Sequence, residues 1–171
     1  MKKFICLFLI VIFSCEKDDI CSGTTQTTPR LVIEFYDLSA PEEVLAVPGL
    51  FAIGLDAEDL EVPINNEIVT TRSTITLPLK TDDILTELKL YKSYDLVDGV
   101  VNGNPDTIKI TYNTENVYVS RACGYKTNFN ILTFGITIDS DQWMISSEIL
   151  LTEITNDQKS NFQINKINIV I

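Results

Sequence analysis

Apolar and polar residues alternate in short segments along most of this chain. In residues 30–37, for example, Leu31, Ile33 and Phe35 are separated by single intervening residues. Successive side chains of a β-strand point to opposite faces of the sheet, so these three apolar side chains would share one buried face. No segment shows a convincing helical periodicity. The pattern therefore predicts an all-β fold.

The same alternation, interrupted by turn-forming residues, predicts further strands over residues 44–47, 50–55, 68–79, 85–94, 107–112, 117–121, 125–134, 143–145, 149–154 and 162–171. Pro78 indicates an edge position or a strand end, because proline has no N–H to donate to a neighbouring strand. A slip in the alternation at Asn165 and Lys166 indicates a β-bulge. Residues 98–106 predict a hairpin loop, and residues 113–116 predict a turn. Short, evenly spaced strands predict a single antiparallel β-sandwich, immunoglobulin-like or similar, of roughly eight to ten strands.

The N-terminus has the pattern of a secretory signal. Lys2 and Lys3 precede an unbroken run of ten apolar residues, 4–13. A helix that spans a bilayer needs about 20 apolar residues, so this run is too short for a permanent anchor. Its length and basic flank are typical of the apolar region of a signal peptide, and the alternative is a buried N-terminal helix.

The end of this run, Ile12-Phe13-Ser14-Cys15, resembles the lipobox of bacterial lipoproteins, although Phe13 is bulkier than the usual residue. The resemblance implies diacylglycerol on the Cys15 sulfur, cleavage before Cys15 and acylation of the new amine. Two or three acyl chains hold a protein at a membrane without a transmembrane segment. We therefore expect a membrane partner, reached through the N-terminal lipid.

This interpretation divides the chain into a signal peptide (1–14), a lipidated flexible tether (15–28) and a β-sandwich domain (29–171). The start of the tether, with Lys17, Asp18 and Asp19, resembles the lipoprotein export signal of Bacteroidetes. That resemblance implies an outer-membrane lipoprotein that faces the medium at the cell surface. The alternative is an ordinary solvated acidic segment.

Two of the four cysteines remain once the signal and the lipidated residue are set aside. They are Cys21 and Cys123. In an oxidising compartment such a pair forms a stable disulfide, and closing a loop of about 100 residues contributes about 4–5 kcal/mol at most. The alternative is two separate buried thiols. With no histidine in the chain, two cysteines do not complete a usual zinc site.

The charge of the chain excludes some partners. The whole chain has a net charge of −11, and removal of Lys2 and Lys3 with the signal leaves 11 Lys and Arg against 24 Asp and Glu, a net charge of −13. Such an acidic surface repels nucleic-acid phosphates, so we expect no nucleic-acid partner.

No pattern of catalytic residues stands out. The absence of histidine removes the usual triads and zinc hydrolases. Acidic residues cluster in predicted loops: Asp56, Glu58 and Asp59; Asp82 and Asp83; Asp139 and Asp141. Paired acids can cleave glycosides or bind calcium, but Asp139-Ser140-Asp141 lacks the glycine and distal glutamate of an EF-hand loop. We expect no catalytic residues, no metal and no cofactor.

Two other residues have a candidate role. Trp143, the only tryptophan, is expected in the core; the alternative is an exposed sugar-stacking platform with Tyr91, Tyr94 or Tyr118. Thr107, in Asp106-Thr107-Ile108, matches the short O-glycosylation pattern of secreted Bacteroidetes proteins.

Several stretches resemble a family of uncharacterised Bacteroidetes lipoproteins, a domain of unknown function: DDIC (18–21), TTPRLVIEFYD (27–37), STITLPL (73–79) and DTIKITYNTENVYVSRACGY (106–125). The resemblance supports a Cys21–Cys123 disulfide and implies no activity. We expect a non-enzymatic binding or envelope-structural module with an unidentified protein or glycan ligand. The alternatives are a periplasm-facing lipoprotein that assists an envelope complex and, third, a two-carboxylate glycan-active enzyme.

Overall fold

The computed structural model describes residues 20–23, 25, 27–156 and 162–166, and these residues form strands, turns and loops without a helix. The eleven strands are β1 (Leu31–Asp37), β2 (Val47–Leu55), β3 (Glu61–Val62), β4 (Thr70–Arg72), β5 (Thr74–Leu77), β6 (Leu85–Val97), β7 (Val100–Ser120), β8 (Gly124–Ile136), β9 (Met144–Ile149), β10 (Glu153–Ile154) and β11 (Phe162–Lys166). The prediction of an all-β chain is confirmed. Candidate residues Cys15, Lys17, Asp18 and Asp19 lie outside the described residues.

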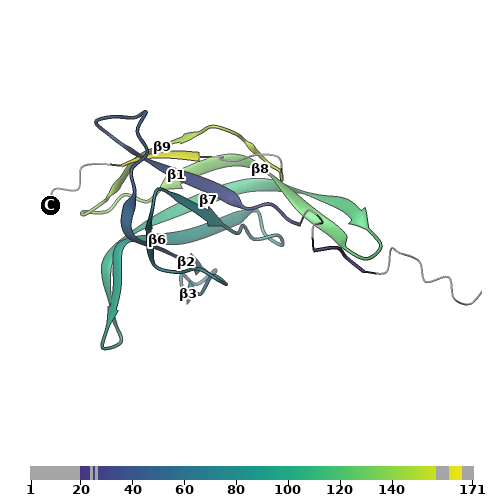
Figure 1. Ribbon diagram of the computed structural model, residues 1–171, viewed down its shortest axis with the longest axis horizontal. Coiled ribbons are helices and arrows are strands. Elements are labelled where there is room, and N and C mark those ends of the chain that lie inside the picture. The colour runs from purple at the N-terminus through teal and green to yellow at the C-terminus, as the bar shows by residue number, and fades with distance from the viewer. Residues whose placement is uncertain (1–19, 24, 26, 157–161, 167–171) are drawn as a thin grey trace, which may run out of the picture.

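The strands form two curled sheets (Figure 1). The smaller sheet has the order β5-β1-β11-β9, and the larger has the order β10-β8-β7-β6-β2-β3, with β4 paired to β2 outside this path. Pairing among the described strands is antiparallel except between β1 and β11, which are parallel. The predicted antiparallel pairing is therefore confirmed except between β1 and β11, and the single sandwich stays a prediction.

The meander of β6, β7 and β8 is longer than the sequence predicts. β7 runs for 21 residues without a break, so the predicted turn at residues 113–116 is wrong: these polar residues are an exposed part of β7, paired with β8. The predicted hairpin at residues 98–106 is confirmed in its position, but its loop is shorter than predicted. Only Asp98 and Gly99 form the turn, both with positive φ, and Val100 already belongs to β7. In both places ladder pairing to a neighbouring strand outweighs the local turn preference of Asn and Gly.

Two local predictions are confirmed. β5 ends at Leu77, directly before Pro78, and it is an edge strand of the smaller sheet. The pairing of β11 with β9 shifts register between Asn165 and Lys166, as expected for a bulge. Both features follow from the backbone chemistry of the residues concerned.

Buried side chains from both sheets form one core. Its members include Leu31, Ile33 and Phe35 from the smaller sheet and Leu90, Ile110 and Tyr112 from the larger. Trp143 is only 3% exposed, and its ring lies 5.8 Å from that of Phe35. Trp143 is thus a core residue, as expected, and does not form an exposed aromatic platform.

A buried carboxylate joins the two sheets. Asp106 of β7 is fully buried, and its Oδ2 accepts hydrogen bonds from the backbone N–H groups of Trp143 (3.0 Å) and Met144 (2.7 Å), where β9 begins. Its Oδ1 has no partner. Burial raises the pKa of Asp106 from 3.8 to about 6, an effect that Asp139 and Asp141 reinforce and the two backbone hydrogen bonds oppose.

A disulfide joins Cys21 to Cys123, as predicted, across 102 positions of sequence. Cys123 lies in the turn between β7 and β8, where Gly124 has a φ of 70°. Positive φ is easily adopted by glycine, which lets the chain reverse at this point. The bond therefore fixes the start of the described chain to the outer end of the β7–β8 hairpin.

Replacing both Cys21 and Cys123 by serine is expected to lower the free energy of unfolding by up to about 4–5 kcal/mol, because the bond closes a loop of about 100 residues in the unfolded chain. Urea denaturation of the two proteins measures the difference. Equal stability, with wild-type thiols shown to be oxidised by mass, would contradict this expectation.

Asp106 should make stability depend on pH. The folded state binds the Asp106 proton more tightly than the unfolded state, so its contribution is greatest below about pH 4 and declines as pH rises through about 6. The shift of about two pKa units corresponds to about 3 kcal/mol. Asp106→Asn removes the titration. The unfolding free energy of the wild type minus that of the variant should therefore fall by about this amount between about pH 4 and about pH 6. A difference that stays constant with pH would refute the raised pKa of Asp106.

Candidate functional site

A cavity of about 470 Å³ lies beside the edge where the smaller sheet ends at β5. Its walls come from the end of β2, from β3 and the loop after it, from the segment after β5, and from β6. The lining residues are mainly apolar: Leu55, Val62, Pro63, Ile64, Pro78, Leu79 and Leu88, with Gly54 among them. The volume is within the range of about 300–1,000 Å³ that is usual for ligand sites.

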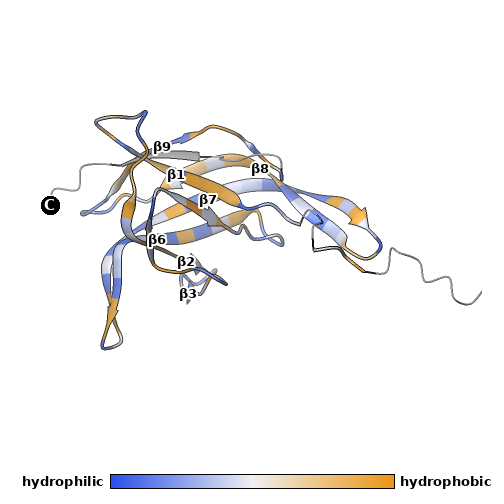
Figure 2. Ribbon diagram, in the orientation of Figure 1, coloured by the Kyte–Doolittle hydropathy of each residue, from blue (hydrophilic) through white to orange (hydrophobic). Residues whose placement is uncertain are grey.

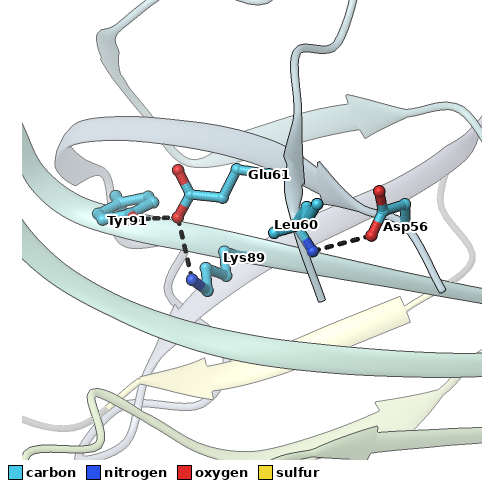
Figure 3. Close-up of polar contacts among 5 residues, drawn as sticks. All are labelled: Asp56, Leu60, Glu61, Lys89 and Tyr91. Atoms are coloured by element: carbon cyan, nitrogen blue, oxygen red, sulfur yellow. Dashed lines mark hydrogen bonds and ion pairs between the residues drawn. The ribbon is translucent and has the colours of Figure 1, made fainter. Parts of the chain in front are cut away.

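One wall is the β2–β3 hairpin, whose turn is built by Asp56 (Figure 3). Its Oδ1 accepts hydrogen bonds from the backbone N–H groups of Glu58 (3.0 Å) and Leu60 (2.8 Å). Asp59 has a φ of 60°, a left-handed conformation that Asp tolerates. The predicted acidic cluster of Asp56, Glu58 and Asp59 is thus a turn in which one carboxylate satisfies two backbone donors.

Glu61 of β3 holds this hairpin against β6 (Figure 3). Its Oε1 accepts hydrogen bonds from Lys89 Nζ at 2.9 Å and from the Tyr91 hydroxyl at 3.0 Å. The hydrogen bond from Lys89 lowers the pKa of Glu61, against the effect of burial. Burial and then the bond to Glu61 raise the pKa of Tyr91 to about 12. Glu61 therefore stays ionised and Tyr91 stays protonated near neutral pH.

The opposite wall is fixed by a network of three hydrogen bonds among Lys80, Thr86 of β6 and Tyr112 of β7. The backbone N–H of Lys80 donates to Thr86 Oγ1 (3.0 Å), and the Tyr112 hydroxyl donates to the Lys80 carbonyl (2.8 Å). Thr86 Oγ1 and the Tyr112 oxygen are 2.6 Å apart, which completes the set. Burial raises the pKa of Tyr112. This network holds the Pro78–Lys80 segment on the larger sheet.

The charged residues around the cavity are not equivalent. Glu87 pairs with Lys109 at 2.8 Å, and the Oδ1 of Asp56 is occupied by backbone donors. Arg30 and Lys80 line the same cavity, and neither takes part in an ion pair within the described part of the chain. Arg30 and Lys80 therefore add two positive groups to a lining that also contains the carboxylate of Asp56, in an otherwise acidic protein. Arg30 also acts on Glu67, whose ionised form it favours.

The lining of the cavity combines apolar and charged side chains. Its apolar lining carries two acidic residues, Asp56 and Glu87, and both have the structural partners described above. Among the residues that the structure describes, no group of three Asp, Glu, Cys or His is arranged to hold a metal ion. The arrangement suits an apolar body with a negatively charged end.

Apart from Asp56, the described residues that were singled out from the sequence lie elsewhere. Thr107 is half-buried in β7, opposite Lys89 in β6, and its neighbour Asp106 is the buried carboxylate between the sheets. The Cys21–Cys123 bond lies at the end of the β7–β8 hairpin. Sequence reasoning missed the cavity, because its lining comes from five separate segments. The pairs Val62-Pro63 and Leu77-Pro78, where strands end in proline, were the available signal.

The alternative of an exposed aromatic platform around Trp143 is not found. Tyr91 is buried beside β3, and Tyr94 packs on Phe51 with ring centroids 4.4 Å apart. Tyr118 is exposed and pairs with Tyr125 at the far end of β7 and β8. Tyr91 and Tyr94 are in edge-to-face contact, with ring centroids 5.2 Å apart, whereas Trp143 is buried.

A second exposed feature is the turn of the β6–β7 hairpin, which projects from the body of the protein (Figure 2, lower left). Four exposed aliphatic residues surround the Asp98-Gly99 turn: Leu96, Val97, Val100 and Val101. Aliphatic side chains at the tip of a projecting hairpin are available for contact with another molecule.

Comparisons with known proteins give a family and no activity. No curated protein and no solved structure matches this chain. The described residues contain no helix suited to crossing a membrane. A family model described as a family of unknown function (DUF6452) matches residues 49–165, from within β2 to within β11. The match covers more than half of the chain, which therefore belongs to this family of unknown function.

Proposed function

We propose that this protein is a lipid-anchored, non-enzymatic binding module of the outer membrane, which holds an amphipathic ligand with an anionic head. The observation that carries the proposal is the cavity of about 470 Å³ between the β2–β3 hairpin and the Pro78–Lys80 segment. Both walls are pinned by hydrogen bonds, so the cavity is formed before a ligand arrives. A preformed site avoids the cost of ordering on binding.

The lining determines the ligand class. Leu55, Ile64 and Leu88 favour an apolar body, because burying apolar surface contributes about 25 cal/mol per Å². Arg30 and Lys80 favour a carboxylate or phosphate at one end, because charge-assisted hydrogen bonds are the stronger ones. A long-chain fatty acid has both properties, and we use it as the representative ligand.

The anchor in this proposal is Cys15, preceded by the apolar run of residues 4–13. The Cys21–Cys123 bond supports a location outside the cytoplasm, because disulfides persist in oxidising compartments. Lys17, Asp18 and Asp19 then act as the export signal of a Bacteroidetes lipoprotein that faces the medium. Residues 15–28 form the tether.

We further propose that residues 29–171 form one domain of the β-sandwich class. Support comes from the shared core, in which Phe35 of the smaller sheet and Tyr112 of the larger belong to one cluster of buried residues. The link from Asp106 to the start of β9 also favours a single unit.

A second candidate function is that of a periplasm-facing lipoprotein that assists an envelope complex. The four aliphatic residues around the β6–β7 turn favour it, because they offer a contact to a protein partner. In this version the lipid anchor is the same and the leaflet differs.

Binding is tested with cis-parinaric acid, a fatty acid whose fluorescence rises in an apolar site. We expect saturable binding that palmitate displaces more readily than hexadecanol, which has the same chain length and no charge. Val62→Trp narrows the cavity and should weaken binding about tenfold, which is about 1.4 kcal/mol. Arg30→Gln with Lys80→Gln should remove the preference for palmitate over hexadecanol.

The matched control is Val101→Trp, which makes the same change at an exposed aliphatic residue of the β6–β7 hairpin. It should bind as the wild type does. Failure of the wild type to bind, or equal loss in both tryptophan variants, would exclude the cavity as the binding site.

Surface exposure is tested by protease shaving of intact cells. The wild-type protein should be degraded, whereas the variant with Lys17, Asp18 and Asp19 changed to alanine should be protected. Cys15→Ser should abolish incorporation of labelled palmitate. Protection of the wild type until the outer membrane is broken would instead favour the periplasm-facing alternative.

A further inference from the structure

Two exposed tyrosines lie at the outer end of the β7–β8 hairpin. Tyr118 is 56% exposed and Tyr125 is 68% exposed, although both are large aromatic residues. They are opposite each other across the two strands, with ring centroids 5.4 Å apart in an edge-to-face arrangement. Each supports the other's orientation, so both rings form one outward-facing surface.

The same end of the hairpin is joined to the N-terminal part of the chain. The disulfide brings the Cα atoms of Cys21 and Cys123 to 4.9 Å, and Cys123 is two residues before Tyr125. Ile20, next to Cys21, is 84% exposed. The two tyrosines and this isoleucine are therefore near the point where the N-terminal segment leaves the described structure.

The length of that segment limits how far this end can be from an anchor at Cys15. Cys21 is six positions after Cys15, and a fully extended chain covers about 3.3–3.6 Å per residue. The hairpin end is thus within about 20 Å of the anchored residue. Without the disulfide, the greatest distance between Cys15 and the folded domain would instead be set by the longer segment that ends at β1.

We propose that the β7–β8 end of the molecule rests on the bilayer that holds the anchor, with Tyr118 and Tyr125 at the level of the lipid headgroups. This inference rests on the proposed lipid anchor. Tyrosine is enriched at membrane–water interfaces, because its ring is apolar and its hydroxyl remains hydrated. The two or three acyl chains of the anchor hold the protein at the membrane, and contacts of this kind orient it there.

This seating orients the rest of the protein. The turn of the β6–β7 hairpin lies at the opposite end of the molecule from the β7–β8 turn (Figure 1). Its aliphatic residues would therefore point away from the bilayer, where a partner in the aqueous space can reach them. The two exposed apolar ends thus have different roles, one toward lipid and one toward solvent.

The test uses the lipidated mature protein bound to vesicles of phosphatidylethanolamine, phosphatidylglycerol and phosphatidylcholine brominated near the headgroup. Bromine quenches tryptophan only at close range, and the native Trp143 is 3% exposed, so wild-type emission should be unchanged. In Tyr118→Trp, the added emission should be strongly quenched. The matched control is Val100→Trp, which places tryptophan at the β6–β7 turn, where Val100 is 62% exposed, and which should not be quenched.

Co-flotation with the vesicles reports the anchor separately. If the protein floats with the vesicles and the emission of Tyr118→Trp is not quenched, the contact of the β7–β8 end with the bilayer is refuted, whereas the lipid anchor is not. Equal quenching of Tyr118→Trp and Val100→Trp overturns the orientation. A protein that does not float refutes the anchor, and with it the seating.

Discussion

The fold depends on keeping two curled sheets together, and the carboxylate of Asp106 is the polar link between them. Its Oδ2 accepts two backbone N–H groups at the start of β9, so the smaller sheet is fixed to β7 of the larger one. Around this link, Phe35 and Trp143 pack from β1 and from the residue before β9. A buried acid is costly unless it is hydrogen-bonded or protonated. Asp106 uses both solutions, since two donors serve one oxygen and burial shifts its titration toward neutral pH.

The cavity is a consequence of how the smaller sheet ends. β5 is an edge strand that stops before Pro78, and β3 is a two-residue edge strand of the larger sheet. Neither edge extends far enough to cover the other, so the space between them is lined by side chains that would otherwise be core. Glu61, Thr86 and Tyr112 hold the walls apart by fixing each one to β6 or β7. Rigid walls are the reason this space can remain open.

The features that sequence reasoning recovers are those that depend on a few neighbouring residues. The apolar alternation of β1, the strand end at Pro78 and the bulge at Asn165 are of this kind. The disulfide was accessible by elimination among four cysteines. Long-range pairing was not accessible, and residues 113–116 illustrate why. Their sequence favours a turn, but β8 supplies a complete set of partners, and the strand continues. The cavity and the role of Asp106 require knowing which sheet each strand joins.

The disulfide also determines the path of mechanical load through the molecule. A pull on the N-terminal segment divides at Cys21, where one path passes through the disulfide to Cys123 and the other follows the backbone to β1. On the first path, the force enters at the turn shared by β7 and β8 and runs along both strands. Their hydrogen bonds to β6 and β10 lie across that direction, so they are loaded together in shear and do not open one after another. If the protein is tethered by its N-terminal segment, this arrangement spreads the load of fluid flow over β7 and β8 as well as β1.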